Sequence, residues 1–190
     1  MIKIASGGVG GVDALHLQNV QHVLVIVHRA FARAELAAPA AIQGAFIPVG
    51  GTFTAFSALT KIFETATSSI LIVDPHADGN LLSEYALSAP ENVTVMVLAD
   101  QATHKPGLKP AAQHWVNQYG QSRPLQIRLA PERTLHDREI IVDDRDVWSL
   151  GQSFNALAKR SSTSLGCVDA DTAKLKISAY GQMWASATPP

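Results

Sequence analysis

Two continuous apolar runs constrain the fold of this chain more than any other feature of its sequence. They cover residues 69–73 and 93–98; Asp74 follows the first directly, and Asp100 follows the second after Ala99. Apolar runs without alternating polar residues are typical of strands buried on both faces, as in parallel sheets with helices on each side. Segments with helical periodicity lie between and around them. The pattern predicts an α/β fold in which a mixed, mainly parallel sheet is flanked by helices.

The other segments fit the same architecture. Residues 125–129 alternate as a third strand should, and residues 139–142 and 147–150 form a pair of strands around a polar turn. A short extended piece is expected at residues 45–49. Helices are predicted over residues 54–67, 81–89, 109–119 and 172–187.

The first 43 residues lie outside this pattern. Asp13 is a suitable N-cap and Pro39 a stop signal for a helix over about residues 13–38. Its apolar face is wider than one small core requires, so two interpretations stay open: a core helix, or an arm that packs on a partner subunit. We therefore divide the chain into an N-terminal helical arm with its linker, residues 1–43, and a main domain, residues 44–190.

Composition and charge narrow the function classes. Fifteen Lys and Arg residues against 16 Asp and Glu give a net charge of −1, which excludes a strongly basic binder of nucleic acid or anionic lipid. The single cysteine, Cys167, excludes an intramolecular disulfide and a zinc site built from several cysteines. No apolar run approaches the ~20 residues that span a bilayer. The N-terminus lacks the pattern of a signal peptide, so a cytoplasmic protein is expected.

Residues suited to phosphate chemistry gather between positions 136 and 155. His136 and Arg138 are two apart, so their side chains share a face on an extended strand. After the turn, Gly151, Ser153 and Asn155 follow with the same alternation. A hairpin would bring an imidazole, a guanidinium, a hydroxyl and a carboxamide to one end of the sheet, and Gly151 would leave room for a ligand near the backbone. This group of side chains suits a phosphate.

The segment resembles the phospholipase D superfamily, whose motif is His-x-Lys, four residues, Asp and then Gly-Ser-x-Asn. His136-Asp-Arg-Glu-Ile-Ile-Val-Asp143 matches that spacing, and Gly151-Gln-Ser-Phe-Asn155 follows it. Arg138 stands in place of the lysine, and an additional residue separates the glycine from the serine. The likeness spans roughly residues 44–187. It implies a phospholipase D-like fold and a phosphodiesterase that acts on a nucleic acid or a phospholipid without metal or cofactor.

The resemblance also implies residue roles. His136 would attack phosphorus and form a phosphohistidine, while a second histidine would protonate the leaving group and then activate water. Asp143 would orient an imidazole, and Arg138, Ser153 and Asn155 would hold the phosphoryl oxygens. Arginine keeps its charge and offers two donors, so the replacement of lysine does not by itself exclude phosphate binding, although it changes the geometry of the contact. Because the chain carries one motif, the expected active form is a two-fold homodimer with its site at the interface.

A second likeness points to binding without hydrolysis. The pentad His136-Asp-Arg-Glu-Ile140, with Trp148 downstream, is similar to the phospholipase D-like C-terminal domain attached to microtubule-interacting and transport modules. Such domains keep the fold and use it to bind membranes. The alternative function is therefore a catalytically degenerate module that binds phosphate or lipid headgroups, with peripheral membrane contact.

Other polar residues follow the predicted strands. Asp74 and His76 come after strand 69–73, where open α/β sheets bind ligands, and are candidate substrate contacts. A solvated turn explains them equally well. Lys159 is a candidate contact for a substrate phosphate, although a solvated basic turn is the simpler interpretation. His104 follows strand 93–98 in the same way.

Overall fold

The computed structural model describes residues 44–190, together with residues 19, 20, 23 and 26. By its internal contacts the chain divides into residues 1–40 and residues 41–190, and the description that follows concerns the second unit. The helix predicted over residues 13–38 falls outside the described residues apart from those four positions. Its two interpretations and the domain boundary after residue 43 stay predictions.

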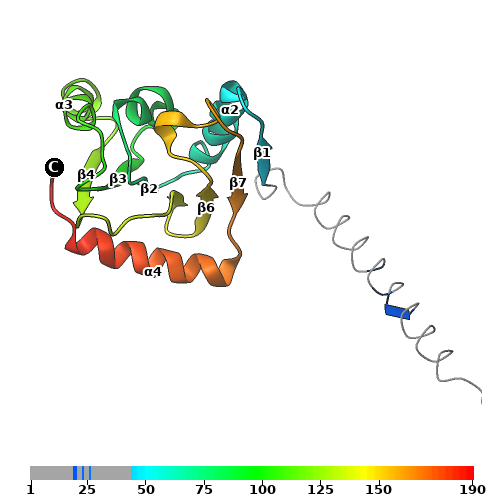
Figure 1. Cartoon of the computed structure of the whole chain (residues 1–190). Coiled ribbons are helices and arrows are strands. Elements are labelled where there is room, and N and C mark those ends of the chain that lie inside the picture. Colours follow the sequence, from blue (N-terminus) through cyan, green and yellow to red (C-terminus); the bar gives the residue numbers. More distant parts are fainter. Residues whose placement is uncertain (1–18, 21–22, 24–25, 27–43) are drawn as a thin grey trace, which may run out of the picture. The chain divides into compact units, whose positions relative to one another are not determined.

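A seven-stranded mixed sheet forms the centre of the described region (Figure 1). Its strand order is β1-β7-β6-β5-β2-β3-β4. The strands are β1 (Ala45–Ile47), β2 (Ser69–Val73), β3 (Thr94–Asp100), β4 (Leu125–Ala130), β5 (Glu139–Val142), β6 (Asp146–Leu150) and β7 (Thr163–Cys167). The predicted α/β fold, with a mixed sheet flanked by helices, is confirmed.

The expectation of a mainly parallel sheet is wrong. β2 and β3 pair in parallel, as do β3 and β4, whereas the four other strand pairs of the described region are antiparallel. A continuous apolar run indicates a strand in the interior of a sheet, but it carries no information on the direction of the neighbouring strand. β7 was not expected at all, because Thr163–Cys167 includes a serine and a glycine and lacks an apolar run.

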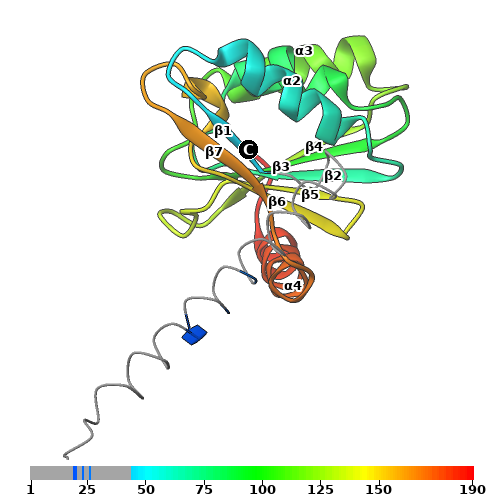
Figure 2. The same cartoon turned by 90° about the vertical axis from the view of Figure 1, so that its right-hand side faces the viewer.

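Helices cover both faces of the sheet (Figures 1 and 2). One face carries α2 (Thr52–Phe63), α3 (Leu108–Tyr119) and the short turns η1 (Leu81–Tyr85) and η2 (Ala86–Ser88). The predicted helix 81–89 is therefore a π-helical turn followed by a 3-10 turn. The opposite face carries α4 (Ala170–Ser186), which packs on a smaller apolar core that includes Leu71 and Ile141. Among the described helices, none combines the length and hydropathy of a transmembrane span.

α4 begins at Ala170 because Asp169 caps it. The Asp169 carboxylate accepts hydrogen bonds from the backbone N–H groups of Asp171 at 3.2 Å and Thr172 at 3.0 Å. The hydrogen bonds from Thr172 in particular hold the pKa of Asp169 below its ordinary value. This fixed start determines which α4 side chains lie against β5 and β6.

Strand direction decides which loops meet. Val73 at the end of β2 pairs with Glu139 at the start of β5, and Glu139 pairs with Ser149 near the end of β6. Antiparallel neighbours run in opposite directions, so the loop after β2, the segment before β5 and the loop after β6 leave the sheet at one end. The parallel strands β3 and β4 end there too. We call this the site end of the sheet; its loops are residues 74–80, 101–107, 131–138 and 151–162.

Candidate active site

His136 lies at the site end, on the segment that connects β4 to β5, and its side chain is exposed. β3 and β2 lie between β4 and β5 in the sheet, so this segment has to cross the ends of both strands. The backbone N–H groups of Thr134 and Leu135 fix the crossing by donating to Asp100 Oδ2, at 3.1 and 3.5 Å. The histidine is therefore presented at the carboxyl ends of the parallel strands.

Asp100, which sequence reasoning did not assign to the site, holds this crossing segment in place. The residue is fully buried at the end of β3, and its Oδ1 also accepts the backbone N–H of Ala102 at 2.8 Å. Burial raises the pKa of Asp100, but hydrogen bonds from backbone N–H groups outweigh burial and hold the pKa below its ordinary value. One feature of the sequence could have pointed to Asp100: an aspartate at the end of an apolar strand, comparable to Asp74 directly after β2.

Arg138 lies two residues beyond His136 and is half-buried. Its Nη1 donates to the backbone oxygen of His136 at 3.2 Å, and its own backbone oxygen accepts from Leu150 N at 2.9 Å. Its Nε is buried and has no hydrogen-bond partner among the described residues. A buried charged donor without an acceptor costs free energy, and an anionic oxygen would satisfy it.

Asp74 links the end of β2 to the loop after β6. The residue is fully buried, and its Oδ2 accepts the hydroxyl of Ser153 at 2.7 Å and the backbone N–H of Phe154 at 2.9 Å. Its Oδ1 accepts the backbone N–H of His76 at 2.9 Å. The interpretation of Asp74 as a substrate contact does not fit this geometry, because both carboxylate oxygens are engaged and shielded. Ser153 is likewise buried with its proton donated to Asp74, so both residues position the loops.

Three other predicted site residues meet beside this link. Asn155 Nδ2 donates to the backbone oxygen of His76 at 3.2 Å, and Lys159 Nζ donates to the backbone oxygen of Asn155 at 3.2 Å. The Nδ1 of His76 lies 3.4 Å from the backbone oxygen of Thr103, in the loop after β3. Asn155 and His76 are half-buried and Lys159 is exposed. These contacts join residues of three loops at the site end.

The residues that alternate with His136 and Arg138 are held by α4. Lys176 Nζ lies 2.6 Å from Glu139 Oε1 and 3.3 Å from Asp137 Oδ2, and the Tyr180 hydroxyl donates to Asp137 Oδ2 at 2.9 Å. Ser149 Oγ donates to Glu139 Oε2 at 2.8 Å. Sequence reasoning missed this cluster. The available signal was that two acidic residues, Asp137 and Glu139, alternate along the chain with His136 and Arg138.

These contacts also set the ionisation of the cluster. Burial raises the pKa of Glu139, although the hydrogen bonds from Lys176 and Ser149 oppose that effect. The hydrogen bond from Tyr180 holds the pKa of Asp137 below its ordinary value. The carboxylates of Asp137 and Glu139 are thus committed to the α4 side of the sheet.

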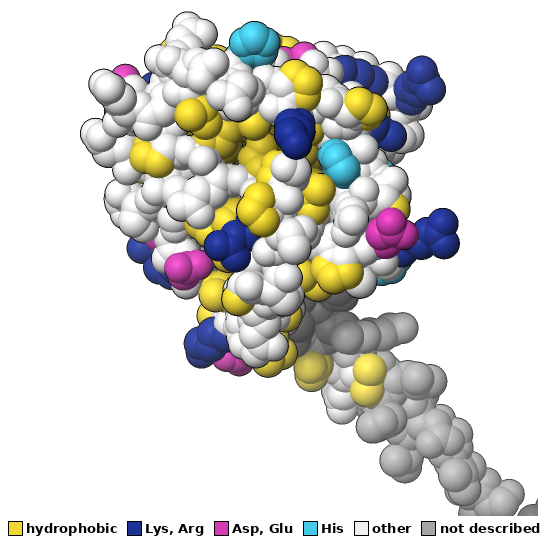
Figure 3. All heavy atoms as spheres, turned by 90° about the vertical axis from the view of Figure 1, so that its left-hand side faces the viewer, with side chains coloured by type: hydrophobic (Ala, Val, Ile, Leu, Met, Phe, Trp, Pro, Cys, Tyr) yellow, Lys and Arg dark blue, Asp and Glu magenta, His cyan; other side chains and the backbone are white. Residues whose placement is uncertain are grey.

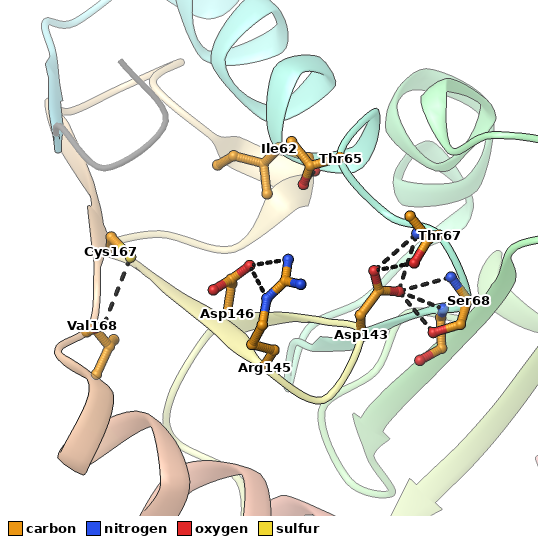
Figure 4. Close-up of polar contacts among 10 residues, drawn as sticks. Ile62, Thr65, Thr67, Ser68, Asp143, Arg145, Asp146, Cys167 and Val168 are labelled. Carbon is orange, nitrogen blue, oxygen red and sulfur yellow. Dashed lines mark hydrogen bonds and ion pairs between the residues drawn. The ribbon is translucent and has the colours of Figure 1, made fainter. Parts of the chain in front are cut away.

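Asp143 lies at the opposite end of β5 from His136. Figure 4 shows its carboxylate beside Thr67 and Ser68. Its carboxylate accepts the backbone N–H groups of Thr67 at 2.9 Å, Ser68 at 2.8 Å and Ser69 at 3.0 Å. Burial raises its pKa, but these hydrogen bonds outweigh burial and hold the pKa well below the ordinary value. The expected role of Asp143 in orienting an imidazole is therefore corrected: it ties the β5–β6 turn to the chain that enters β2.

Gly151 faces β7 and does not face an open space. A Cβ at this position would lie 3.0 Å from Thr163 Oγ1 and 3.3 Å from Ser164 N, and the Gly151 N–H donates to the Ser164 oxygen at 2.9 Å. Close packing against β7 therefore explains the glycine, and its predicted role in leaving room for a ligand stays a prediction.

A groove on the α3 side of the molecule is apolar. It encloses about 420 Å³ and is lined mainly by side chains of η1 and α3, among them Leu82, Trp115 and Tyr119. Figure 3 shows apolar side chains gathered in a hollow on the side of the molecule where α3 lies. The lining contains no lysine or arginine, so the groove does not suit a phosphate. The residues with phosphate chemistry lie on the site-end loops. No group of three or more His, Cys, Asp or Glu residues within the described part of the chain is arranged to hold a metal.

Comparison with known proteins identifies the fold. No protein-family model matches the chain, and no curated protein matches it in sequence. The solved structure of Nuc from Salmonella typhimurium, described as a phospholipase D family member, has a TM-score of 0.58 at 16% identity and covers 78% of this chain and 96% of its own. NucT from Helicobacter pylori has a TM-score of 0.56 at 11% identity, with 78% and 99% coverage. The chain has a phospholipase D-like fold.

Proposed function

We propose that this protein is a phosphodiesterase that cleaves a nucleic acid or a phospholipid with His136 as its nucleophile. The observation that carries the proposal is the Nε of Arg138, a buried guanidinium donor without a partner among the described residues, two residues from an exposed histidine. A cation fixed beside a nucleophile is what a phosphodiester requires, because its non-bridging oxygens carry the negative charge.

The proposed reaction has two displacement steps. The His136 imidazole attacks phosphorus, a P–N bond forms, and the P–O bond to the leaving group breaks. Arg138 binds a non-bridging oxygen through Nε and Nη2, while Lys159 and the Asn155 carboxamide lie at the same end of the sheet and bind the substrate. Water then attacks phosphorus, the P–N bond breaks, and His136 is regenerated. No step requires a metal ion.

Turnover of a chromogenic phosphodiester tests this proposal. Bis(p-nitrophenyl) phosphate in EDTA should release p-nitrophenolate with the native protein and not with His136→Ala. His114→Ala is the matched control, since His114 is exposed on α3 and lines the apolar groove. Equal rates for the native protein and His136→Ala would refute the nucleophile.

A second candidate function is phosphate or lipid-headgroup binding without turnover. It is favoured by two observations: arginine replaces the lysine of the motif, and the hydroxyl of Ser153 is committed to Asp74. Vesicles that contain anionic phospholipid should then float with the native protein and not with Arg138→Ala. Equal flotation of both proteins would exclude Arg138 as the contact.

We also propose a homodimer in the cytoplasm. The dimer is supported by the presence of one His-x-Arg motif in the chain, and a reducing compartment suits a protein whose only cysteine, Cys167, is free. Sedimentation equilibrium measures the assembly directly. A strict monomer at assay concentration would refute the dimer.

A further inference from the structure

Apolar side chains are exposed at one corner of the site end. Val49, in the turn after β1, is 60% exposed, and Phe53 and Phe56, in the first turns of α2, are 79% and 38% exposed. The two phenylalanines are three residues apart, so they share one face of α2, and their ring centroids lie 6.3 Å apart. We call these three residues the apolar corner. Exposed apolar side chains that gather on one surface mark an interaction site, whereas single ones do not.

The apolar corner lies beside a loop of the candidate active site. Ile47 at the end of β1 pairs with Thr163 at the start of β7, so the turn after β1 leaves the sheet next to the loop between β6 and β7. The two are joined directly, because the Gly50 N–H donates to the Ala158 oxygen at 2.8 Å. Ala158 is followed by Lys159, which the proposed function assigns to substrate binding.

A row of aromatic rings backs the apolar corner. The ring centroid of Phe56 lies 6.2 Å from that of Tyr85 in η1, and the centroid of Tyr85 lies 5.4 Å from that of Phe154. Tyr85 and Phe154 are buried, and the Phe154 N–H donates to Asp74 at 2.9 Å. The corner is therefore the outer end of a packed row that reaches the residues which hold the site loops.

The segments around the apolar corner contain cations and no acids. Residues 44–63, which include β1 and α2, have no Asp or Glu, and neither do residues 147–168, which run from β6 to β7. The same segments contain Lys61, Lys159 and Arg160, and all three side chains are exposed. Three cations against no acids give this side of the sheet a local charge of +3 in a chain whose net charge is −1. Such a surface attracts an anionic partner.

We propose that the apolar corner inserts into an anionic phospholipid bilayer, with Lys159 and Arg160 on the lipid headgroups around it. Phenylalanine and valine side chains gain free energy when they leave water, and each cation near an anionic leaflet adds attraction. Docking holds the site end against the bilayer, so the substrate is a phospholipid. This choice between the two substrate classes rests on the proposed function, whereas the docking itself does not.

A nucleic acid fits the apolar corner less well. Base stacking needs an open ring face, but Phe53 and Phe56 pack on each other, and Phe56 also packs on Tyr85. Val49 has no ring on which a base could stack. Three cations also provide few contacts for a phosphate backbone, whose binding depends on many of them.

The apolar corner is compatible with the proposed dimer. β1 is an edge strand, and β5, which follows His136 and Arg138, is the fourth strand in the order β1-β7-β6-β5 (Figure 2). At about 4.8 Å between neighbouring strands, β1 and β5 are about 14 Å apart. A partner at the motif and a bilayer at the corner therefore contact the same end of the sheet at different places.

Flotation on vesicles tests the apolar corner. The native protein should float with vesicles of phosphatidylcholine and phosphatidylserine, and the double variant Val49→Ser with Phe53→Ser should bind about 100-fold more weakly. Both side chains are exposed, so its melting temperature should stay native. Leu175→Ser is the matched control, because Leu175 is 73% exposed on α4, on the other face of the sheet, and should bind as the native protein does.

The cations have a readout of their own. Lys159→Gln with Arg160→Gln should weaken binding to the same vesicles by about 10-fold at low salt and should change little at about 1 M salt, where charges are screened. The loss caused by Val49→Ser with Phe53→Ser should persist at that salt, because it is apolar. Lys174→Gln, on α4 beside Asp171, is the matched control and should bind as the native protein does.

The alternative outcomes are distinct. Equal flotation of the native protein and Val49→Ser with Phe53→Ser would overturn the proposal, and so would absence of flotation by the native protein. If that variant lost binding to a labelled single-stranded oligonucleotide and floated normally, the corner would belong to a nucleic acid. A change from dimer to monomer with normal flotation would assign it to a second copy of the chain. Docking without His136-dependent release of p-nitrophenolate would refute the proposed function and leave the docking surface in place.

Discussion

At both ends of the sheet, aspartate carboxylates accept backbone N–H groups, but the segments that they hold differ. At the end where β2 begins, Asp143 accepts three backbone N–H groups and closes the structure (Figure 4). At the site end, Asp74 and Asp100 also accept backbone N–H groups, but they hold loops that carry His136, Arg138 and His76. The motif residues on either side of β5 therefore lie at opposite ends of the sheet, and our proposal places the chemistry at the end that carries His136 and Arg138.

The difference lies in what remains unsatisfied. The oxygens of Asp143 are fully engaged by the chain that enters β2, so this carboxylate is not available to a ligand. At the site end the aspartates are satisfied in the same manner, but two buried groups have no hydrogen-bond partner among the described residues: the Nε of Arg138 and the hydroxyl of Thr163 at the start of β7. Carboxylates bonded to N–H groups position the chain, whereas the unpaired Nε of Arg138 is the group to which our proposal assigns the phosphate.

The largest effect should come from Asp74→Ala. The substitution leaves the Ser153 hydroxyl and the N–H groups of Phe154 and His76 without acceptors, and the free energy of unfolding should fall by about 4 kcal/mol. Hydrolysis by the remaining native protein should fall by about 100-fold, because the loops lose their positions. Urea unfolding and the nitrophenyl assay measure the two effects.

Asp78→Ala is the control for this prediction. Asp78 is in the same loop and accepts the N–H groups of Asn80 at 3.0 Å and Leu81 at 3.2 Å, and among the described residues it has no hydrogen bond to the loop after β6. We expect it to cost about 1 kcal/mol. Equal losses of activity for the two variants would show that the comparison between the ends does not depend on the Asp74 link.

Lys176→Met should have the next largest effect. It leaves the buried Glu139 carboxylate without its cation, and breaking such a pair from one side costs about 3 kcal/mol. The double variant with Glu139→Gln should recover part of this loss, because no buried charge is left. Lys174→Met is the matched control on α4, since its pair with Asp171 is exposed and such pairs contribute about 0–1 kcal/mol. A double variant less stable than Lys176→Met would contradict this account.

Asp143→Asn should have the smallest effect and should act on stability alone. Asparagine tolerates the positive φ of 52° at this position, so the loss reflects the charge, and we expect about 1–2 kcal/mol. Because the folded pKa is lowered, the contribution is complete above the unfolded pKa of about 3.9 and is lost as the pH falls below it. The difference from the native protein should be constant at pH 6–7 and shrink below about pH 4.

Asp144→Asn, at the exposed neighbouring position, provides the reference for that titration. A loss of catalytic activity in folded Asp143→Asn would return Asp143 to the active site. It would also remove the distinction between the two ends of the sheet.

Sequence patterns predicted where the strands lie in the chain better than they predicted which strands pair with each other. β2 matches its predicted bounds because an apolar run flanked by polar residues identifies a buried strand by itself. The antiparallel pairing of β2 with β5 depends on contacts between residues about 70 positions apart, which no local pattern encodes. β7 was missed for a related reason, since it is defined by pairing with β6 and β1 more than by its own residues.

The same limit explains the site. Alternation placed His136 and Arg138 correctly on the approach to β5, because it is a local property of an extended chain. The roles of Asp143 and Asp74 could not be predicted in this way. They depend on the end of the sheet at which each residue lies and on the backbone N–H groups that donate to it there. Asp100 was overlooked because its partners, Thr134 and Leu135, come from the loop after the following strand.

The hydrogen bond between Asp74 and Ser153 joins residues 79 positions apart, and this separation has a consequence for folding kinetics. The β2–β3–β4 unit contains contacts of shorter range and can form before the β5–β6 hairpin docks, because closing a long loop costs entropy that only later contacts offset. The proposed phosphate site would then be among the last features to appear. Anion binding would report completed folding, whereas the formation of helices and of β2–β4 would report an earlier stage.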